Sequence, residues 1–259
     1  MVQWGGFVTV SWHDAPEGHR VKLLDLTLPT PAENLALDEA LLEQAESGDG
    51  PPEVLRLWES SQAMVVVGRS SRVDDEVDRD ACQRMGIPIF RRSSGGAAVV
   101  AGPGCLMYAV VLDYQRRPQV QMIQQAHCYV IGMLARAIRP LIPDVSCCGT
   151  SDLALHGRKF SGNSLRCKRT HLLYHGTLLY AFPLDLISTC LKQPPRQPEY
   201  RQGRNHDDFV ANLPLTAEQL RMALIRTWCT DATLGTWPQL RTRELVQQRY
   251  SQDSWNLRR

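Results

Sequence analysis

The sequence predicts an α/β protein that combines antiparallel strands with amphipathic helices, and three stretches carry this prediction. Residues 105–112 are apolar enough to form a central strand. Residues 152–181 divide into three consecutive strands separated by turn residues. Residues 119–139 repeat apolar side chains every three or four positions, as a helix packed on a sheet does. At 259 residues, one large domain, or one domain with a small appendage, is expected.

Composition excludes several classes of protein. A hydrophobic content of 43% and a charged content of 22% are typical of a soluble protein, and a net charge of +2 does not indicate a nucleic acid or a membrane partner. No apolar run is long enough to span a bilayer, and residues 1–19 lack the pattern of a secretory signal. The eight cysteines contain no Cys-x-x-Cys pair, so we expect reduced thiols, no metal site and a cytoplasmic protein.

The first half of the chain is expected to alternate strands and helices. Thr30-Pro31-Ala32-Glu33 has the pattern of a capping box with proline at the first helical position, so a helix should begin there and end at Gly48. Pro88 indicates an edge position for the apolar segment that contains it. The other expectations are a loosely held extension over residues 1–20, strands over 22–26, 54–58 and 64–67, a helix over 74–85 and an apolar segment over 87–90.

In the second half, strands are expected over residues 152–155, 159–165 and 172–181, with turns at His156-Gly157 and at 168–170. A short helix should follow over 183–191. Residues 192–208 are rich in proline, arginine and polar side chains, and we interpret them as a loop that a ligand could order. Two helices, over 216–229 and 238–250, close the chain.

Two glycine-containing motifs indicate a ligand that bears phosphate or carboxylate. Residues 91–96 place two arginines, two serines and two glycines after an apolar segment, a composition that lets backbone amides approach an anion. Residues 157–163 hold Lys159 between glycines on a tight hairpin. Gly-Gly after a strand is also an ordinary turn, and a surface arginine pair is usually solvated. Neither motif is a Walker loop or the Gly-x-Gly-x-x-Gly of a dinucleotide fold.

Several motifs in one order resemble the lipoate-protein ligase family. They are residues 34–39, 55–58, 65–69, 91–96, 151–153, 157–163 and 175–179. The resemblance covers about residues 21–215, which we interpret as a catalytic domain, and leaves 216–259 as a C-terminal helical segment. It implies an α/β fold around a mainly antiparallel sheet flanked by helices, which the family shares with biotin ligases.

The resemblance also implies an activity. A ligase of this family activates lipoate or octanoate with ATP and Mg²⁺ as an acyl-adenylate, and then transfers the acyl group to a lysine of a lipoyl-domain or H-protein-type carrier. Lys159 would be catalytic, because its ammonium would neutralise charge where the carboxylate meets the α-phosphate. The substrate-binding and nucleotide-binding residues would be Arg69, Arg91, Ser94, Gly95, Gly96, Asp152, Ser161, Gly162 and His175.

Three of these residues could instead have a purely structural role and take no part in binding or catalysis. Lys159 could be a hairpin lysine in water, His175 a packed core histidine, and Asp152 a turn residue at the start of a strand.

The sequence departs from the ligase pattern in two places, which leaves alternatives open. Ala97 and Ala101 stand where ligases have a third glycine and a histidine, and residues 102–104 resemble the octanoyltransferase relatives. Only a short helical tail follows residue 215 where ligases often carry a further domain, so an accessory subunit could be needed. The first alternative is an ATP-independent octanoyl or lipoyl transferase that uses a thioester on Cys147 or Cys148, although their spacing from Lys159 differs from that branch. The second is a non-catalytic binder of acyl groups or carriers.

Overall fold

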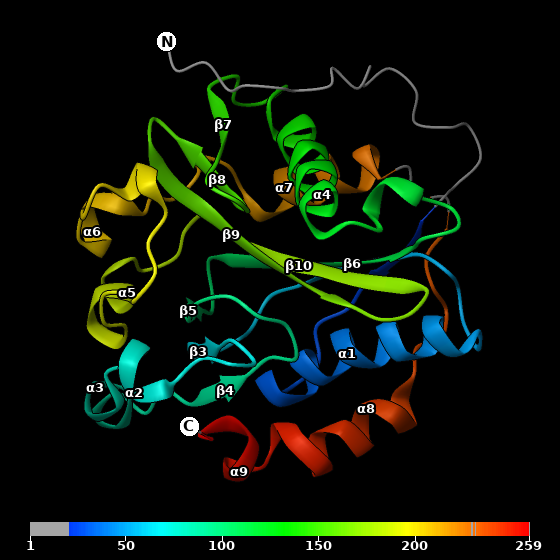
Figure 1. The fold of residues 1–259 in the computed structure, drawn as a ribbon, viewed down its shortest axis with the longest axis horizontal. Coiled ribbons are helices and arrows are strands. Elements are labelled where there is room, and N and C mark those ends of the chain that lie inside the picture. Colours follow the sequence, from blue (N-terminus) through cyan, green and yellow to red (C-terminus); the bar gives the residue numbers. More distant parts are fainter. Residues whose placement is uncertain (1–20, 229, 231, 259) are drawn as a thin grey trace.

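A seven-stranded main sheet runs through the middle of the protein (Figure 1). The computed structural model describes residues 21–258 except 229 and 231. Every neighbouring pair of strands is antiparallel except the first pair, so the prediction of a mainly antiparallel sheet is confirmed. In spatial order the strands are β1 (Lys22–Asp25), β2 (Val54–Trp58), β6 (Cys105–Asp113), β10 (His171–Leu179), β9 (Arg158–Cys167), β8 (Asp152–Leu155) and β7 (Val145–Cys148).

A second, three-stranded sheet lies beside the first (Figure 1). In spatial order its strands are β4 (Ile89–Arg91), β3 (Met64–Val67) and β5 (Val99–Ala101). β4 occupies an edge, as Pro88 predicts. β5 was not predicted from the sequence, and neither was β7 in the main sheet.

The predicted helix over 74–85 is two helices, α2 (Val73–Glu76) and α3 (Arg79–Arg84). Between them Val77 is extended and forms an isolated bridge with Leu191. The Asp78 carboxylate accepts a hydrogen bond from the backbone N–H of Ala81 at 2.8 Å and so caps α3. A capping residue lies outside the helix that it starts, so Asp78 marks a break in the chain between α2 and α3. The acidic residues of this segment therefore belong to two short helices rather than one.

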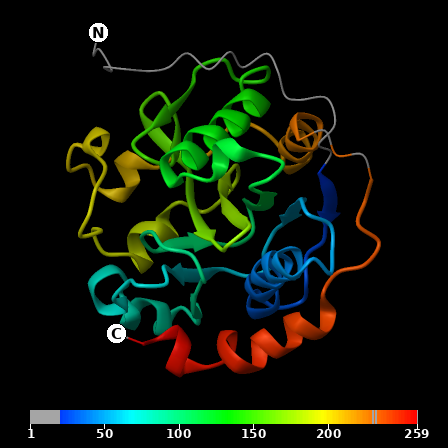
Figure 2. The ribbon, with the colours of Figure 1, turned by 45° about the vertical axis from the view of Figure 1, so that its right-hand side comes forward.

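Helices cover both faces of the main sheet (Figures 1 and 2). α4 (Ile123–Ile138) and α7 (Ala217–Thr227) lie on one face, and α1 (Pro31–Ser47) lies on the other, with α8 (Gln239–Leu245) packed along it. α1 begins with the predicted capping box of Thr30 and Glu33 and ends at Gly48, whose φ of 80° is left-handed.

The shorter elements refine the predictions for the second half. α5 (Asp185–Cys190) confirms the predicted short helix, whereas the predicted loop over 192–208 contains η2 (Glu199–Arg201) and α6 (His206–Phe209). The predicted last helix is α8 followed by the π-helical turn η3 (Val246–Tyr250), and a separate short helix, α9 (Asp253–Asn256), comes after it. A 3-10 turn, η1 (Pro118–Val120), precedes α4. The predictions for residues 1–20 and Cys229 lie outside the described residues. In the part of the chain that the structure describes, no helix is long and apolar enough to cross a membrane.

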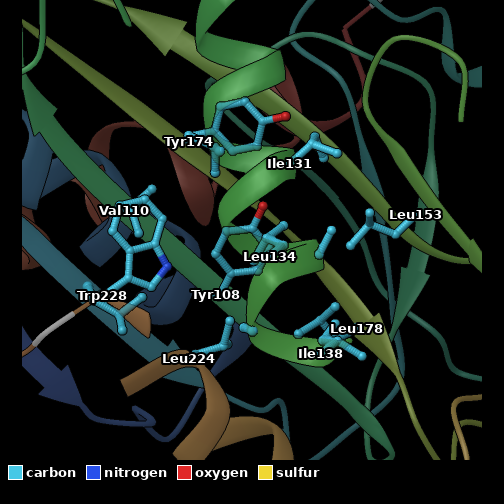
Figure 3. Close-up of a cluster of buried hydrophobic side chains, with 14 of the residues drawn as sticks. Tyr108, Val110, Ile131, Leu134, Ile138, Leu153, Tyr174, Leu178, Leu224 and Trp228 are labelled. Atoms are coloured by element: carbon cyan, nitrogen blue, oxygen red, sulfur yellow. The ribbon is translucent and has the colours of Figure 1, made fainter. Parts of the chain in front are cut away.

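Alternate residues of β6 face opposite layers of the protein. Tyr108 and Val110 point toward α4 and α7, where they pack with Leu134 and other buried side chains (Figure 3). Met107 and Ala109 belong to the clusters on the opposite face. Both sets are apolar because both faces are covered, which explains the continuous apolar run in the sequence.

A buried ion pair fixes α1 to the main sheet. Arg56 of β2 is fully buried, and its Nη1 lies 2.5 Å from Oδ1 of Asp38 on α1. Its Nη2 donates to Asn34 Oδ1 at 2.6 Å, one helical turn before Asp38. Burial lowers the pKa of Arg56, and the charge of Asp38 opposes that shift. The Asp38 carboxylate therefore compensates the cost of burying the guanidinium charge.

This pair predicts a large loss of stability in Asp38→Ala. The substitution leaves the Arg56 charge buried without its anion, so the free energy of unfolding should fall by about 3 kcal/mol or more. Urea denaturation measures the change. Asp49→Ala, which removes an exposed carboxylate just after α1, serves as the control and should stay within about 0.5 kcal/mol of the parent. Equal losses in both variants would contradict the role of the pair.

Candidate active site

Two adjoining cavities meet at Lys159. We call the first the α6 lobe; it spans about 810 Å³, part of which is open to solvent, and its apolar wall includes Phe160, Leu191 and Phe209. We call the second the α1 lobe; it spans about 1130 Å³, again partly open to solvent, and is walled partly by Leu35 and the main sheet. Residues that line both lobes mark their junction, and they are Ala97, Ala98, Val99, Lys159, Gly162, Thr177, Arg196 and Pro198.

A one-residue register change in β9 aims Lys159 into this junction. β8 and β9 join through the predicted two-residue turn, in which His156 and Gly157 have φ of 50° and 74°. Asp152 pairs with Gly162, yet Ala154 pairs with Lys159, so β9 has one extra residue, a β-bulge. Paired residues share a face of a sheet, so the bulge places Lys159 on the face of Asp152. In an unshifted register, Lys159 would point to the opposite face.

The Lys159 ammonium is held by contacts on this face. Nζ lies 2.8 Å from Asp152 Oδ1, and the side chain of Lys159 keeps 27% exposure. Any Cβ at position 162 would come within 2.9 Å of Lys159 Nζ and Cε, so glycine there gives the lysine room to lie across the strand. Tyr200 donates its hydroxyl to Asp152 Oδ2 at 2.8 Å, and burial with the nearby Asp152 charge raises the pKa of Tyr200. Asp152 therefore orients the lysine and a tyrosine at once.

The loop over residues 91–98 folds around the buried side chain of Arg92. Its guanidinium donates to the carbonyls of Val66 at 3.0 Å, Gly95 at 2.5 Å and Ala97 at 2.9 Å. Burial lowers the pKa of Arg92 to about 10, while the Glu76 charge opposes the shift. Gly96 has a φ of 86°, which allows the loop to curl around the guanidinium. Arg92 lines the α1 lobe as a buried cation.

His175 links this loop to the ion pair beneath it. Its Nε2 lies 2.6 Å from Ser94 Oγ, and its Nδ1 lies 3.4 Å from Asp38 Oδ2. A carboxylate that accepts from Nδ1–H leaves Nε2 to accept the serine proton. His175 is thus both a packed histidine and a lining residue of the α1 lobe.

The structure brings most of the predicted site residues together. Five lining residues, Lys159, Asp152, Gly96, Gly162 and His175, surround the α1 lobe or the junction. Ser161 lines the α6 lobe, and Ser94 lies directly behind His175.

The remaining predicted residues lie elsewhere. Arg91 is fully buried, and its guanidinium donates to the carbonyls of Gly68 at 2.7 Å and Arg258 at 2.6 Å, so it ties β4 to the C-terminal segment. Arg69 is exposed and is not among the described residues that line the two lobes. A Cβ at Gly95 would meet nothing within 4 Å, so close packing does not require glycine there.

The two adjacent cysteines point in opposite directions. Cys148 pairs with Asp152, and Cys147 pairs with Leu153. Since paired residues share a face, Cys148 lies on the Lys159 face and Cys147 on the α4 face.

The lining residues that the sequence analysis did not name as site residues include Glu76, Arg92, Arg196 and Thr177. The sequence did contain a signal for Arg92. Arg91 and Arg92 are adjacent in an extended segment, where neighbouring side chains point to opposite sides, so only one of them can face a cavity. Among the described residues, no group of three or more His, Cys, Asp or Glu side chains is arranged to hold a metal ion.

The sequence profile of the lipoyl protein ligase A/B catalytic domain matches residues 30–232. The chain belongs to this family. Octanoyltransferase LipM of Brevibacillus brevis is 24% identical over 266 residues, covering 89% of this chain and 96% of LipM. Lipoate-protein ligase A subunit 1 of Thermoplasma acidophilum is 27% identical over 252 residues, covering 90% of this chain and 95% of the relative. Lipoyl protein ligase A/B relatives thus include proteins named for either activity.

Solved structures show the same fold. One chain, from the structural analysis of a bi-partite lipoate protein ligase and its E2 lipoyl domain from Thermoplasma acidophilum, has a TM-score of 0.77 at 24% identity, and the match covers 92% of this chain and 96% of that chain. Lipoate-protein ligase A bound with ATP has a TM-score of 0.74 at 25% identity and covers 92% of this chain and 99% of its own. The fold is therefore that of the biotin/lipoate ligase catalytic domain.

Lys159→Ala should abolish acyl transfer to a lipoyl-domain acceptor while leaving the fold intact. The side chain is partly exposed and contributes a charge rather than packing, so stability should change by less than about 1 kcal/mol. The mass of the acceptor reports transfer, and thermal unfolding reports stability. Lys168→Ala, which removes a lysine beyond the far end of β9, should transfer normally. Near-normal transfer by Lys159→Ala would remove this residue from the mechanism.

Proposed function

We propose that this protein is a lipoate-protein ligase that activates octanoate or lipoate with ATP and transfers the acyl group to a lysine of a lipoyl-domain carrier. The observation that carries the proposal is the charge of the cavity lining. The two lobes present five cationic side chains against two carboxylates; the cations are Arg92, Lys159, Lys192, Arg196 and Arg201, and the carboxylates are Glu76 and Asp152. Such an excess suits phosphate and carboxylate, whereas a thioester carbonyl is neutral.

The two lobes suit different parts of the substrates. The α6 lobe combines apolar walls for a base with the cations Lys192 and Arg196, so it suits the nucleotide and its phosphates. The α1 lobe has Leu35, Val66 and Met107 in its wall, which suit an acyl chain. A carboxylate at the end of that chain would meet the α-phosphate at the junction, beside Lys159.

Lys159 has the chemistry that this step needs. Its ammonium is a point charge on a flexible stem, so it can move from Asp152 to the two anions that must approach one another. The carboxylate oxygen bonds to the α-phosphorus as pyrophosphate leaves, and Lys159 stabilises the charge on the phosphoryl oxygens. The carrier amine then bonds to the acyl carbon, and AMP leaves with the oxygen that joined it to the acyl group.

Magnesium would be held largely by the phosphates of ATP, with Asp152 as a carboxylate at the junction. It would supply further neutralisation of the polyphosphate charge.

The partners follow from the relatives. A relative of nearly the same length is named subunit 1 of a ligase, and a similar structure comes from an archaeal lipoylation system described as a bi-partite lipoate protein ligase and its E2 lipoyl domain. We infer that the acceptor is a lipoyl-type domain and that an accessory subunit assists the first half-reaction.

A transferase is the second candidate, because Cys148 shares the Lys159 face and relatives include LipM octanoyltransferases. Its thiolate would attack an octanoyl thioester, the carrier thiolate would leave, and the acceptor amine would then displace Cys148.

Three acyl donors separate these functions. The protein is incubated with a lipoyl-domain acceptor and with octanoate plus ATP and Mg²⁺, synthetic octanoyl-AMP, or an octanoyl carrier protein, and the acceptor is weighed by mass spectrometry. We expect acylation from octanoyl-AMP even without an accessory subunit, and Cys148→Ser should retain it.

Transfer from the octanoyl carrier protein alone, lost in Cys148→Ser, would assign the protein as a transferase. No product with any donor would favour a non-catalytic binder.

A further inference from the structure

A segment over residues 193–205, here called the strap, contributes Arg196 and Pro198 to the lining of both lobes. Tyr200 binds it to Asp152 through the 2.8 Å hydrogen bond described above. Arg204 Nη2 donates to the carbonyl of Gly157 in the β8–β9 turn at 3.0 Å. The Tyr200 ring also packs against Phe209, with ring centroids 5.2 Å apart. The strap is thus attached to the same hairpin that carries Lys159.

Two of the three arginines of the strap are committed to the protein itself. Arg201 Nε donates to the carbonyl of Arg204 at 2.8 Å, and Arg204 Nε donates to the carbonyl of Arg201 at 3.0 Å. Both guanidinium groups also lie over the Phe209 ring, at 4.6 and 5.3 Å from its centroid. These contacts make Arg201 and Arg204 part of the structure of the strap.

Arg196 differs from both. Its side chain is exposed, it lines both lobes, and it makes no hydrogen bond or ion pair with any other described residue. The other cation at the junction, Lys159, is matched by Asp152. The junction therefore holds a cation that no protein anion neutralises.

We propose that Arg196 is a further substrate-binding residue that binds the phosphate of the acyl-adenylate from the strap. An acyl-adenylate carries a single negative charge at the phosphate that joins its two halves, where the two lobes meet. A guanidinium can donate two parallel hydrogen bonds to such a phosphate, which a lysine cannot do. The inference rests on the proposed function, since a thioester has no charge at its reacting carbon.

A pair of matched ligands tests this inference by isothermal titration calorimetry. Octanoyl-AMP and 5′-O-octanoyladenosine share the acyl chain and the nucleoside and differ in the phosphate. Arg196→Ala should weaken octanoyl-AMP binding by about tenfold, the effect of one charge-assisted contact to phosphate. Binding of 5′-O-octanoyladenosine should be unchanged, and added salt should reduce the difference between parent and variant.

Arg226→Ala is the matched control, because it removes an exposed arginine from α7 on the opposite face of the main sheet (Figure 1). It should bind both ligands as the parent does. Equal affinities of parent and Arg196→Ala for octanoyl-AMP, or equal losses for the two ligands, would overturn the role of Arg196 and leave the ligase function standing. A parent protein that binds neither ligand would overturn the ligase function and this inference together.

Discussion

The site depends on one extra residue in β9. The register change between β8 and β9 brings Lys159 and Asp152 to the same face of the main sheet, where their charged atoms lie 2.8 Å apart. Without that change the lysine would point toward the layer of α4, which is filled by the apolar cluster shown in Figure 3. Bulges often redirect a side chain next to an active site. Here the bulge gives a partly exposed cation access to both lobes.

Other features of the site follow from this placement. Asp152 forms an ion pair with Lys159 through one oxygen and accepts a hydrogen bond from Tyr200 on the other, so the strap and the lysine share one carboxylate. The opposite wall, the loop around Arg92, is attached to α1 through Ser94, His175 and Asp38. Both walls of the cavity are therefore fixed to the main sheet, which holds the charged side chains of the lining in place.

The sequence predicted the elements whose signals are local. The strands over 54–58 and 64–67 have the predicted bounds, and Thr30 and Gly48 delimit α1 as expected, because apolar runs, capping side chains and left-handed glycines act within a few residues. The turn at His156 and Gly157 was predicted for the same reason. The resemblance to known motifs led to Lys159 and to most of the residues around it.

What the sequence did not predict depends on distant partners. The bulge is defined only by the pairing of β9 with β8, and β7 forms by pairing with the edge of β8. Arg91 and Arg92 are the same residue type, yet Arg91 binds the C-terminal segment and Arg92 lines the α1 lobe. Arg196 stood in a segment interpreted as a loop, and its position over both lobes follows from the contacts of Tyr200 and Arg204.

The central claim is that a carboxylate and an α-phosphate react at the junction beside Lys159, and isotope transfer tests it most directly. Octanoate labelled with heavy oxygen in its carboxyl group is incubated with ATP, Mg²⁺, the protein, any accessory subunit it requires and a lipoyl-domain acceptor, and the AMP is weighed by mass spectrometry. The carboxylate oxygen that bonds to phosphorus stays there when the carrier amine breaks the acyl bond, so the AMP should carry a single heavy oxygen. Acylated acceptor accompanied by unlabelled AMP, or by no AMP, would contradict the account.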